Sequence, residues 1–170
     1  KNQKIYGSGS GFIFKRDANK YYLITNNHVV ESADSIKVTL SDDSSFDTTL
    51  VGTDKYLDIA VLSFESNKDH SIAEIGSSAE ARVGDTVFTV GAPIDSTVYS
   101  WTVTRGILSG KDRKVTVSTT SNSYSADYIR TALTTDAVIN SGNSGGPLCN
   151  SNGEVIGITK MDDIKHKNNL

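Results

Sequence analysis

The chain has too few cysteines, histidines and long apolar runs for several classes of protein. Cys149 is its only cysteine, so no internal disulfide is possible. Its three histidines, at positions 28, 70 and 166, are scattered, and we predict neither a metal site nor a cofactor. No apolar run approaches the roughly 20 residues that span a bilayer. The net charge of −3, without a basic excess, gives no indication of nucleic-acid binding.

What is present is an ordinary globular composition. Hydrophobic residues make up 36% and charged residues 22% of the 170 residues, a length that suffices for one large domain or two small lobes. The first residue is Lys1 rather than methionine, from which we expect that a leader or anchor has been removed.

Short β-strands dominate the predicted secondary structure. Threonines, seven tyrosines and short Val/Ile/Phe runs between Gly, Asn and Asp clusters favour strands. We expect them near residues 11–15, 20–25, 35–40, 45–52, 58–64, 86–92, 101–108, 114–119, 127–134, 146–150 and 154–160. Helical turns are expected only after His28 and around 77–81, and a mobile loop at 118–123. This spacing predicts an all-β barrel or sandwich, with a seam near 82–84 between two lobes.

A serine between glycines is the strongest chemical signal in the chain. Around Ser144, the glycines at 142, 145 and 146 permit a sharp turn that lifts the hydroxyl into the open. The same turn can aim the backbone N–H groups of Gly142 and Ser144 at one point, which is how an oxyanion is stabilised. A solvated Gly/Ser loop is the alternative, but apolar residues at 137–139 and 147–148 favour a loop clamped between core segments.

A serine nucleophile needs a base, and His28 follows the predicted strand 20–25. Neutral imidazole accepts a proton near pH 7. His70 lies in a polar loop and His166 in a charged tail, so only His28 has a context that fixes its ring. A half-exposed structural histidine is the alternative interpretation.

The carboxylate that orients the base is predicted at Asp58, directly before the apolar run 59–62. A charge beside such a strand is costly unless it is paired, and an imidazole N–H is a suitable partner. Asp54 lies in a polar turn and Asp136 close to the serine, and both are interpreted as structural.

The order His28, Asp58, Ser144 is that of chymotrypsin-type enzymes. An α/β-hydrolase also has a G-x-S-x-G segment, and Asp162 and His166 follow the serine as that fold requires. Pro147 blocks the helix that should come next in such a fold, and the chain has no βαβ pattern, so we reject this alternative.

The glycine-rich segment 7–11 superficially resembles a phosphate-binding loop. It precedes a predicted strand, whereas phosphate loops follow a strand and open a helix. We therefore interpret it as the glycine-assisted start of a strand.

Several stretches together resemble the protease domain of the HtrA/Deg family. They occur in the family's order and cover most of the chain: residues 9–14, 23–30, 58–62, 82–85, 90–93, 102–109, 135–148 and 153–158. The resemblance implies two chymotrypsin-like antiparallel β-barrels with the active site in the cleft between them, residues 1–82 forming the first lobe and 83–170 the second. It also implies a serine endopeptidase of unfolded or exported proteins that works outside the cytoplasm, often as a homotrimer.

Carried over residue by residue, the resemblance makes His28 the general base, Asp58 its orienter and Ser144 the nucleophile. The oxyanion hole is expected at Gly142, Asn143 and Ser144. The residues expected to bind substrate are Val138, Ile139, Asn140 and Ser141, near the pocket for the residue before the cut, and Gly157, Ile158 and Thr159, on the strand that pairs with the substrate backbone. No acidic residue is placed in that pocket, so cleavage after small aliphatic residues is expected.

Three departures from the family keep a second hypothesis open. We expect no PDZ domain in this chain, the polar segment 161–170 does not look like the last strand of the second barrel, and 111–126 is longer and more polar than usual. The alternative to a protease is therefore a protease-fold module that binds polypeptides with an idle or regulated site. A plain all-β adhesion module is the third interpretation.

Overall fold

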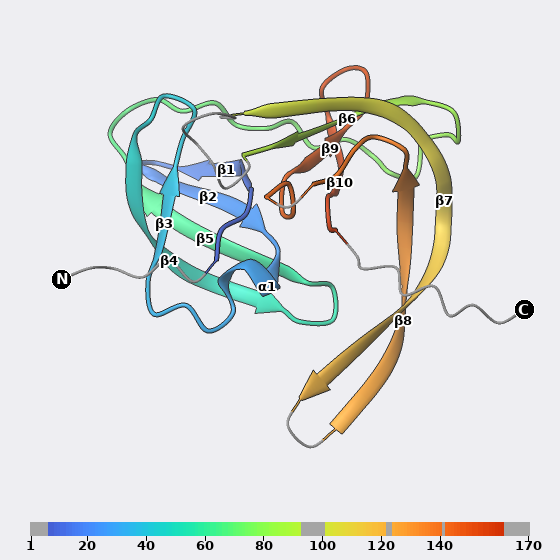
Figure 1. Ribbon diagram of the computed structural model, residues 1–170. Helices are drawn as coiled ribbons and strands as arrows, with labels where there is room; N and C mark the ends of the chain where they lie inside the picture. The colour runs from blue at the N-terminus through green and yellow to red at the C-terminus, as the bar shows by residue number, and fades with distance from the viewer. Residues whose placement is uncertain (1–6, 93–100, 122–123, 141, 162–170) are drawn as a thin grey trace, which may run out of the picture.

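The computed structural model describes residues 7–92, 101–121, 124–140 and 142–161. Their regular elements are β1 (Phe12–Asp17), β2 (Lys20–Thr25), α1 (Asn27–Val30), β3 (Ile36–Thr39), β4 (Ser45–Asp54), β5 (Ile59–Glu65), β6 (Thr86–Gly91), β7 (Thr102–Ser121), β8 (Tyr124–Thr135), β9 (Pro147–Cys149) and β10 (Val155–Ile158). The strands form two five-stranded sheets, which lie beside each other in Figure 1.

The first sheet has the strand order β1-β2-β5-β4-β3, with antiparallel neighbours throughout. Alternate side chains along β2 are buried, among them Tyr21 and Leu23, because successive side chains of a strand point to opposite faces. They pack with Ala60, Leu62 and Phe64 of β5 into the core of this half. The apolar run that the sequence places after Asp58 is therefore the central strand of the first sheet.

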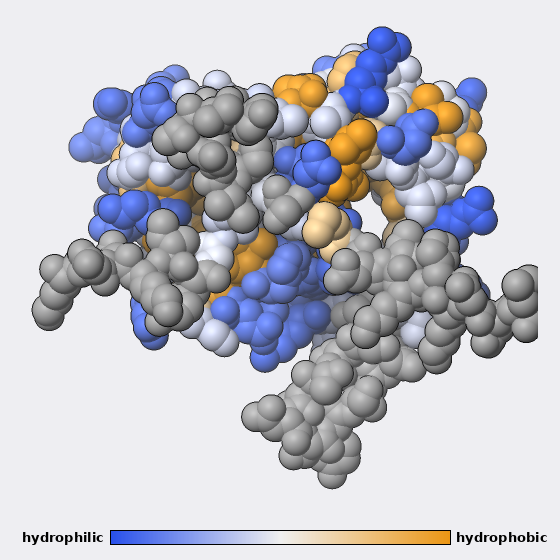
Figure 2. Space-filling view, in the orientation of Figure 1, coloured by the Kyte–Doolittle hydropathy of each residue, from blue (hydrophilic) through white to orange (hydrophobic). Residues whose placement is uncertain are grey.

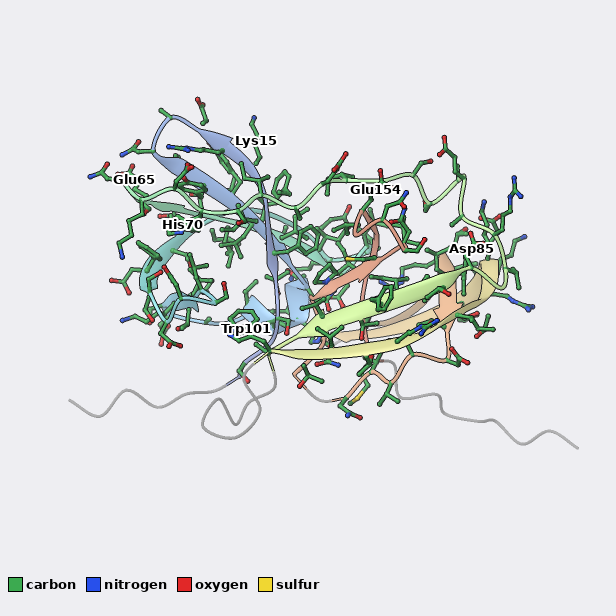
Figure 3. The ribbon with its side chains drawn as sticks, turned by 90° about the horizontal axis from the view of Figure 1, so that it is seen from above. Lys15, Glu65, His70, Asp85, Trp101 and Glu154 are labelled. Carbon is green, nitrogen blue, oxygen red and sulfur yellow. The ribbon has the colours of Figure 1, made fainter. Side chains whose placement is uncertain are left out.

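The second sheet has the order β10-β9-β6-β7-β8 and curls into a half-barrel (Figure 1). Its core contains Val87, Leu108, Leu148 and Ile156, which come from four different strands or their ends. In Figure 3, Asp85 lies at the end of the second sheet that is farthest from the first sheet. Lys15, Glu65 and His70 lie on the opposite side of the molecule, in and around the first sheet. Apolar side chains also reach the surface over this half (Figure 2). On β7, Val103 and Ile107 are exposed.

The predicted all-β class is confirmed, and the two antiparallel sheets are consistent with a chymotrypsin-type double β-barrel. The strands expected near 20–25, 35–40 and 86–92 agree with β2, β3 and β6 within about a residue at each end. Among the described residues, no helix is both long and apolar enough to cross a membrane.

The longest strand corrects the prediction of two strands at 101–108 and 114–119. These segments belong to one strand, β7, which pairs with β8 across two irregularities in register, between Leu108 and Gly110 and between Gly110 and Arg113. Residues 118–121, expected as a loop, are the last part of the same strand, while 122–123 lie outside the described residues. Pairing with β8 supplies the backbone hydrogen bonds that the polar composition alone did not predict.

The expected helical turns also differ in detail. The turn predicted after His28 begins before it, since α1 starts at Asn27. The segment 77–81 forms a turn at residues 78–80 and no helix. A single turn gains few internal hydrogen bonds, so its exact position depends on tertiary contacts.

Candidate active site

His28 lies in the short helix α1, directly after strand β2. The side-chain amide of Asn26 donates from Nδ2 to the carbonyl oxygen of Asp58 at 2.9 Å, and the N–H of Asn27 donates to the same oxygen at 3.1 Å. These bonds tie the start of α1 to the residue that precedes β5. The helix therefore carries His28 to the side of Asp58.

Asp58 follows a tight turn in which Asp54 Oδ1 accepts the N–H groups of Tyr56 and Leu57, each at 2.9 Å. The backbone of Asp58 has a positive φ of 57°, in the left-handed region. Its carboxylate accepts twice from His28: the backbone N–H donates to Oδ1 at 2.9 Å, and Nδ1 of the ring lies 2.8 Å from Oδ2. The structure thus brings the predicted base and the predicted acid into direct contact.

This contact sets the charge of Asp58 and the tautomer of His28. Asp58 is only 5% exposed. Burial raises the pKa of its carboxyl, but hydrogen bonds from the side chain and backbone of His28, and from the Lys160 ammonium, outweigh burial and bring the pKa to about 2. An ionised carboxylate only accepts hydrogen bonds, so the hydrogen of the neutral imidazole is on Nδ1. Nε2 of His28 is then the nitrogen that can accept a proton.

The loop that carries Ser144 is buried and is held from one side by Thr159, the residue after β10. The carbonyl of Thr159 accepts the N–H of Gly145, and its own N–H donates to Gly146 O, both at 2.8 Å. Its hydroxyl donates to Asn143 O at 2.6 Å. Thr159 was predicted to bind substrate, but it is 3% exposed and its polar groups bond to the serine loop.

Ser10 holds the same loop from the other side. Its N–H donates to Ser144 O at 2.8 Å, its hydroxyl donates to Gly142 O at 2.6 Å, and the hydroxyl oxygen accepts the N–H of Ala92 at 2.7 Å. Its carbonyl accepts the hydroxyl of Thr25, at the end of β2, at 2.7 Å. A single buried serine therefore connects the first sheet, the end of β6 and the candidate nucleophile loop.

The sequence did not reveal this role for Ser10. The segment 7–11 was interpreted only as the glycine-assisted start of a strand, because glycines and serines are common in such places. The partner Gly142 is 132 residues away along the chain. The sequence signal for this role is a small hydroxyl residue between two glycines, because the glycines leave room for another backbone segment to approach closely. A side chain at Gly9 would crowd both Val29 and Ser144 O.

The serine hydroxyl contacts the chain after β10. Ser144 Oγ accepts the N–H of Met161 at 3.2 Å, and Ser144 is 9% exposed. Between His28 and Ser144, both described, the structure has no hydrogen bond. The serine loop nevertheless abuts the segment that leads to His28, since a Cβ on Gly145 would lie 2.5 Å from Thr25 Oγ1 and 3.1 Å from the backbone nitrogen of Asn26.

Two backbone N–H groups of the loop are available to a ligand. The N–H of Asn143 donates to Asn140 O at 3.0 Å and is therefore engaged within the loop. For the N–H groups of Gly142 and Ser144, no described residue serves as acceptor. Of the three residues predicted to form an oxyanion hole, Gly142 and Ser144 therefore have N–H groups without a described acceptor, and the hole itself stays a prediction.

The strand expected to pair with substrate is an edge strand. Gly157 and Ile158 of β10 pair with β9 on one side. The outer side of β10 is occupied at Val155, which exchanges backbone hydrogen bonds with Glu74 and Gly76 at 2.8 and 2.9 Å. At Gly157 and Ile158, no described strand pairs with the outer side. An extended peptide could add there as a further strand.

The residues expected near the specificity pocket lie just before the serine loop. Val138 is 55% exposed, and its carbonyl accepts the hydroxyl of Thr104 at 2.8 Å. Ile139 is half-buried and Asn140 is exposed. Ser141, the fourth of these residues, lies outside the described part of the chain.

The other titratable candidates serve the scaffold or cannot be placed. Asp136 Oδ1 accepts the N–H of Ile107 at 2.7 Å, so it supports the approach to the serine loop as expected from its position. The ring of His70 packs edge-on against the rings of Tyr21 and Phe46 in the first half of the molecule. Asp162 and His166 lie outside the described residues. Within the described residues, no cluster of His, Cys, Asp and Glu could hold a metal ion.

Comparison with known proteins gives relatives that are named as peptidases or serine proteases. The family model "Trypsin-like peptidase domain" matches residues 9–158. The chain is 46% identical over 163 residues to "Serine protease Do-like HtrA" of Bacillus subtilis (strain 168), covering 94% of this chain and 35% of that protein. It is 41% identical over 159 residues to "Probable periplasmic serine endoprotease DegP-like" of Hahella chejuensis, covering 94% of this chain and 30% of that protein. The chain spans about a third of the length of these curated relatives.

Proposed function

This chain belongs to the trypsin-like peptidase domain family, as a domain of the HtrA/DegP type, and on that premise we propose that it is a serine endopeptidase. The observation that carries the proposal is the two-point contact between His28 and Asp58 beside the glycine-bounded Ser144 loop. In this proposal Ser144 is the nucleophile, His28 the general base and Asp58 the residue that orients it.

The chemistry follows from the protonation states. Nε2 of His28 takes the proton of Ser144 Oγ as the oxygen attacks the carbonyl carbon of the scissile peptide. The carbonyl oxygen becomes an oxyanion, for which Gly142 and Ser144 offer N–H donors. The C–N bond then breaks, and the imidazolium gives its proton to the leaving amine. A water molecule, deprotonated by His28 in the same way, then attacks the acyl-enzyme, and the ester bond breaks to release the acid product and free Ser144. Asp58, with a pKa of about 2, stays ionised throughout.

The proposed substrates are polypeptides in extended conformation. Main-chain pairing with the free side of β10 at Gly157 and Ile158 requires an unfolded segment, because folded strands already use these groups. We place the pocket for the residue before the cut at 138–141, where the sequence offers no acidic side chain for Arg or Lys. We therefore propose that the enzyme cleaves after Val, Ala, Ile or Leu.

The boundary of the two lobes is proposed between residues 82 and 83.

An extracytoplasmic location and a homotrimer are proposals of the same kind. The location is supported by the word "periplasmic" in the names of the DegP-like relatives from Hahella chejuensis and Pseudomonas putida (strain GB-1). The trimer rests on the family resemblance alone.

A binding module with an idle site is the second candidate. It is favoured by one observation: Ser144 Oγ accepts from Met161 N, and no hydrogen bond joins it to His28 in this structure. Catalytic hydrogen bonds often form only in the complex with substrate, so the protease proposal is compatible with this geometry as well.

Covalent labelling by a fluorophosphonate probe separates the candidates. The probe reacts with a serine only when a base activates it. Mass spectrometry of the wild-type chain should show one adduct per chain, at Ser144, and none in Ser144→Ala. Wild-type protein should cleave casein, while Ser144→Ala should not, with an unchanged circular dichroism spectrum. Absence of labelling in a folded wild-type chain that still binds unfolded casein would establish the idle module instead.

A further inference from the structure

Lys160 makes a contact that the catalytic assignment does not use. It follows Thr159 at the end of β10, and its ammonium nitrogen lies 3.1 Å from Asp58 Oδ2. This is the oxygen that also faces Nδ1 of His28 at 2.8 Å. The lysine side chain is 25% exposed and that of Asp58 is 6% exposed. The candidate acid is therefore held between two cationic or potentially cationic groups.

The neighbours of Lys160 fix its place. Thr159 is bonded into the serine loop through its N–H, carbonyl and hydroxyl. On the other side, Met161 donates its N–H to Ser144 Oγ at 3.2 Å. With both adjacent residues bound, the backbone of Lys160 cannot drift as that of a surface lysine would. Less conformational freedom is then lost when its ammonium binds the carboxylate.

Two other charged groups near the pair, within the described part of the chain, have partners of their own. Lys55, in the turn before β5, forms an ion pair with Glu31 after α1 at 3.2 Å, so their charges offset each other. Arg130 of β8 donates to the carbonyl oxygen of Leu57 at 3.1 Å. Among the lysines and arginines that the structure describes, Lys160 is therefore the one whose ion pair with the carboxylate is seen.

We propose that Lys160 is a positioning residue of the acid–base pair: its ammonium holds the Asp58 carboxylate in place and opposes a second positive charge on the ring of His28. This inference rests on the proposed role of His28 as a base. Two donors on one oxygen lie within about 6 Å of each other, a range in which like charges repel appreciably in a partly buried site. Protonation of His28 would place a second positive charge beside Lys160. The ammonium opposes this step by charge repulsion, so removing the ammonium should make the step easier.

The consequence is measured on the acidic limb of the pH profile of kcat/KM. Lys160→Met removes the charge while keeping much of the apolar stem, and Lys160→Arg keeps the charge. In Lys160→Met the midpoint of the limb should move to higher pH by about one unit, allowing for solvent screening of a partly exposed lysine. In Lys160→Arg it should stay within a few tenths of a unit of wild type. A merely structural role would lower the rate at every pH without moving the midpoint.

A second measurement keeps the test independent of catalysis. The ring signals of His28 are followed by NMR between pH 4 and 9 in a Ser144→Ala background, with Lys160→Met and Lys160→Gln as two neutral variants. The midpoint of the His28 signal should rise by about one unit in both neutral variants. If the midpoints of folded variants coincide with that of the parent, the proposal is wrong. A shift in the NMR midpoint without any probe labelling of wild type would uphold Lys160 and refute the protease function.

Discussion

Asp58→Asn tests the electrostatic account of the site through stability rather than activity. The substitution keeps the shape of the side chain and removes the charge that His28 and Lys160 contact. It is made in a Ser144→Ala background, so that self-digestion cannot distort the unfolding curves. The matched control is Asp47→Asn, since the Asp47 side chain is 93% exposed and its ion pair with Lys37 spans 3.8 Å.

The magnitude follows from the pKa of Asp58. The interval between the ordinary value of 3.8 and the folded value of about 2 corresponds to about 2.4 kcal/mol of stability at neutral pH. Because folding lowers this pKa, the contribution is fully present above pH 4 and is lost as the pH falls through 2. The unfolded chain binds the proton first, and this draws the equilibrium toward the unfolded state on acidification.

Urea unfolding of Asp58→Asn and of Asp47→Asn is compared with that of the Ser144→Ala parent between pH 2 and 7. Asp58→Asn should lower the free energy of unfolding by about 2 kcal/mol from pH 5 to 7, and the difference should shrink steadily below pH 4. Asp47→Asn should change it by a few tenths of a kcal/mol at every pH. A difference for Asp58→Asn that is independent of pH, or that grows on acidification, would refute the reasoning that the carboxylate is stabilised as an anion.

Two further predictions concern the serine loop. Gly145→Ala, at a φ of 89°, should lower the free energy of unfolding in urea by about 3 to 5 kcal/mol, because the new Cβ would collide with the Ser10 carbonyl. The control Gly153→Ala, at a φ of 85° with open space around it, should lower it by only about 1 to 2 kcal/mol. Equal losses in the two variants would mean that the collision at Gly145 is relieved. Ser10→Ala removes the hydrogen bonds to Gly142 O and Ala92 N, and should lower the free energy of unfolding by about 1 to 2 kcal/mol. It should also lower kcat/KM at least about tenfold, because the N–H groups proposed to bind the oxyanion are held less firmly. An unchanged kcat/KM would show that Ser10 does not position the loop.

The contact between His28 and Asp58 could be predicted because each residue has a local signature. His28 follows a strand of alternating burial, and Asp58 precedes an apolar strand where an unpaired charge would be costly. These are properties of a few neighbouring residues, which periodicity and composition report directly. The all-β class was predictable for the same reason.

The roles of Ser10, Thr159 and Lys160 could not be predicted in this way. Each depends on contacts with residues far away in the chain, such as Ser10 with Gly142 and Lys160 with Asp58. The segment after β10 looked merely polar, and nothing local shows that its first charge returns to the first sheet. Strand β7 was divided in two for a similar reason, since its polar half is a strand only through its pairing with β8.

The left-handed backbone at Asp58 restricts which residues that position can accept, apart from any question of catalysis. Asparagine and glycine adopt such a φ at small cost, whereas glutamate, alanine and β-branched residues lose about 1 to 2 kcal/mol. A lineage that gave up proteolysis but kept the fold would therefore drift here toward Asn or Gly rather than toward a random set. The longer carboxylate of glutamate is disfavoured by the backbone before its reach to His28 matters. The conformation of one residue thus channels the evolutionary routes by which this site can be lost.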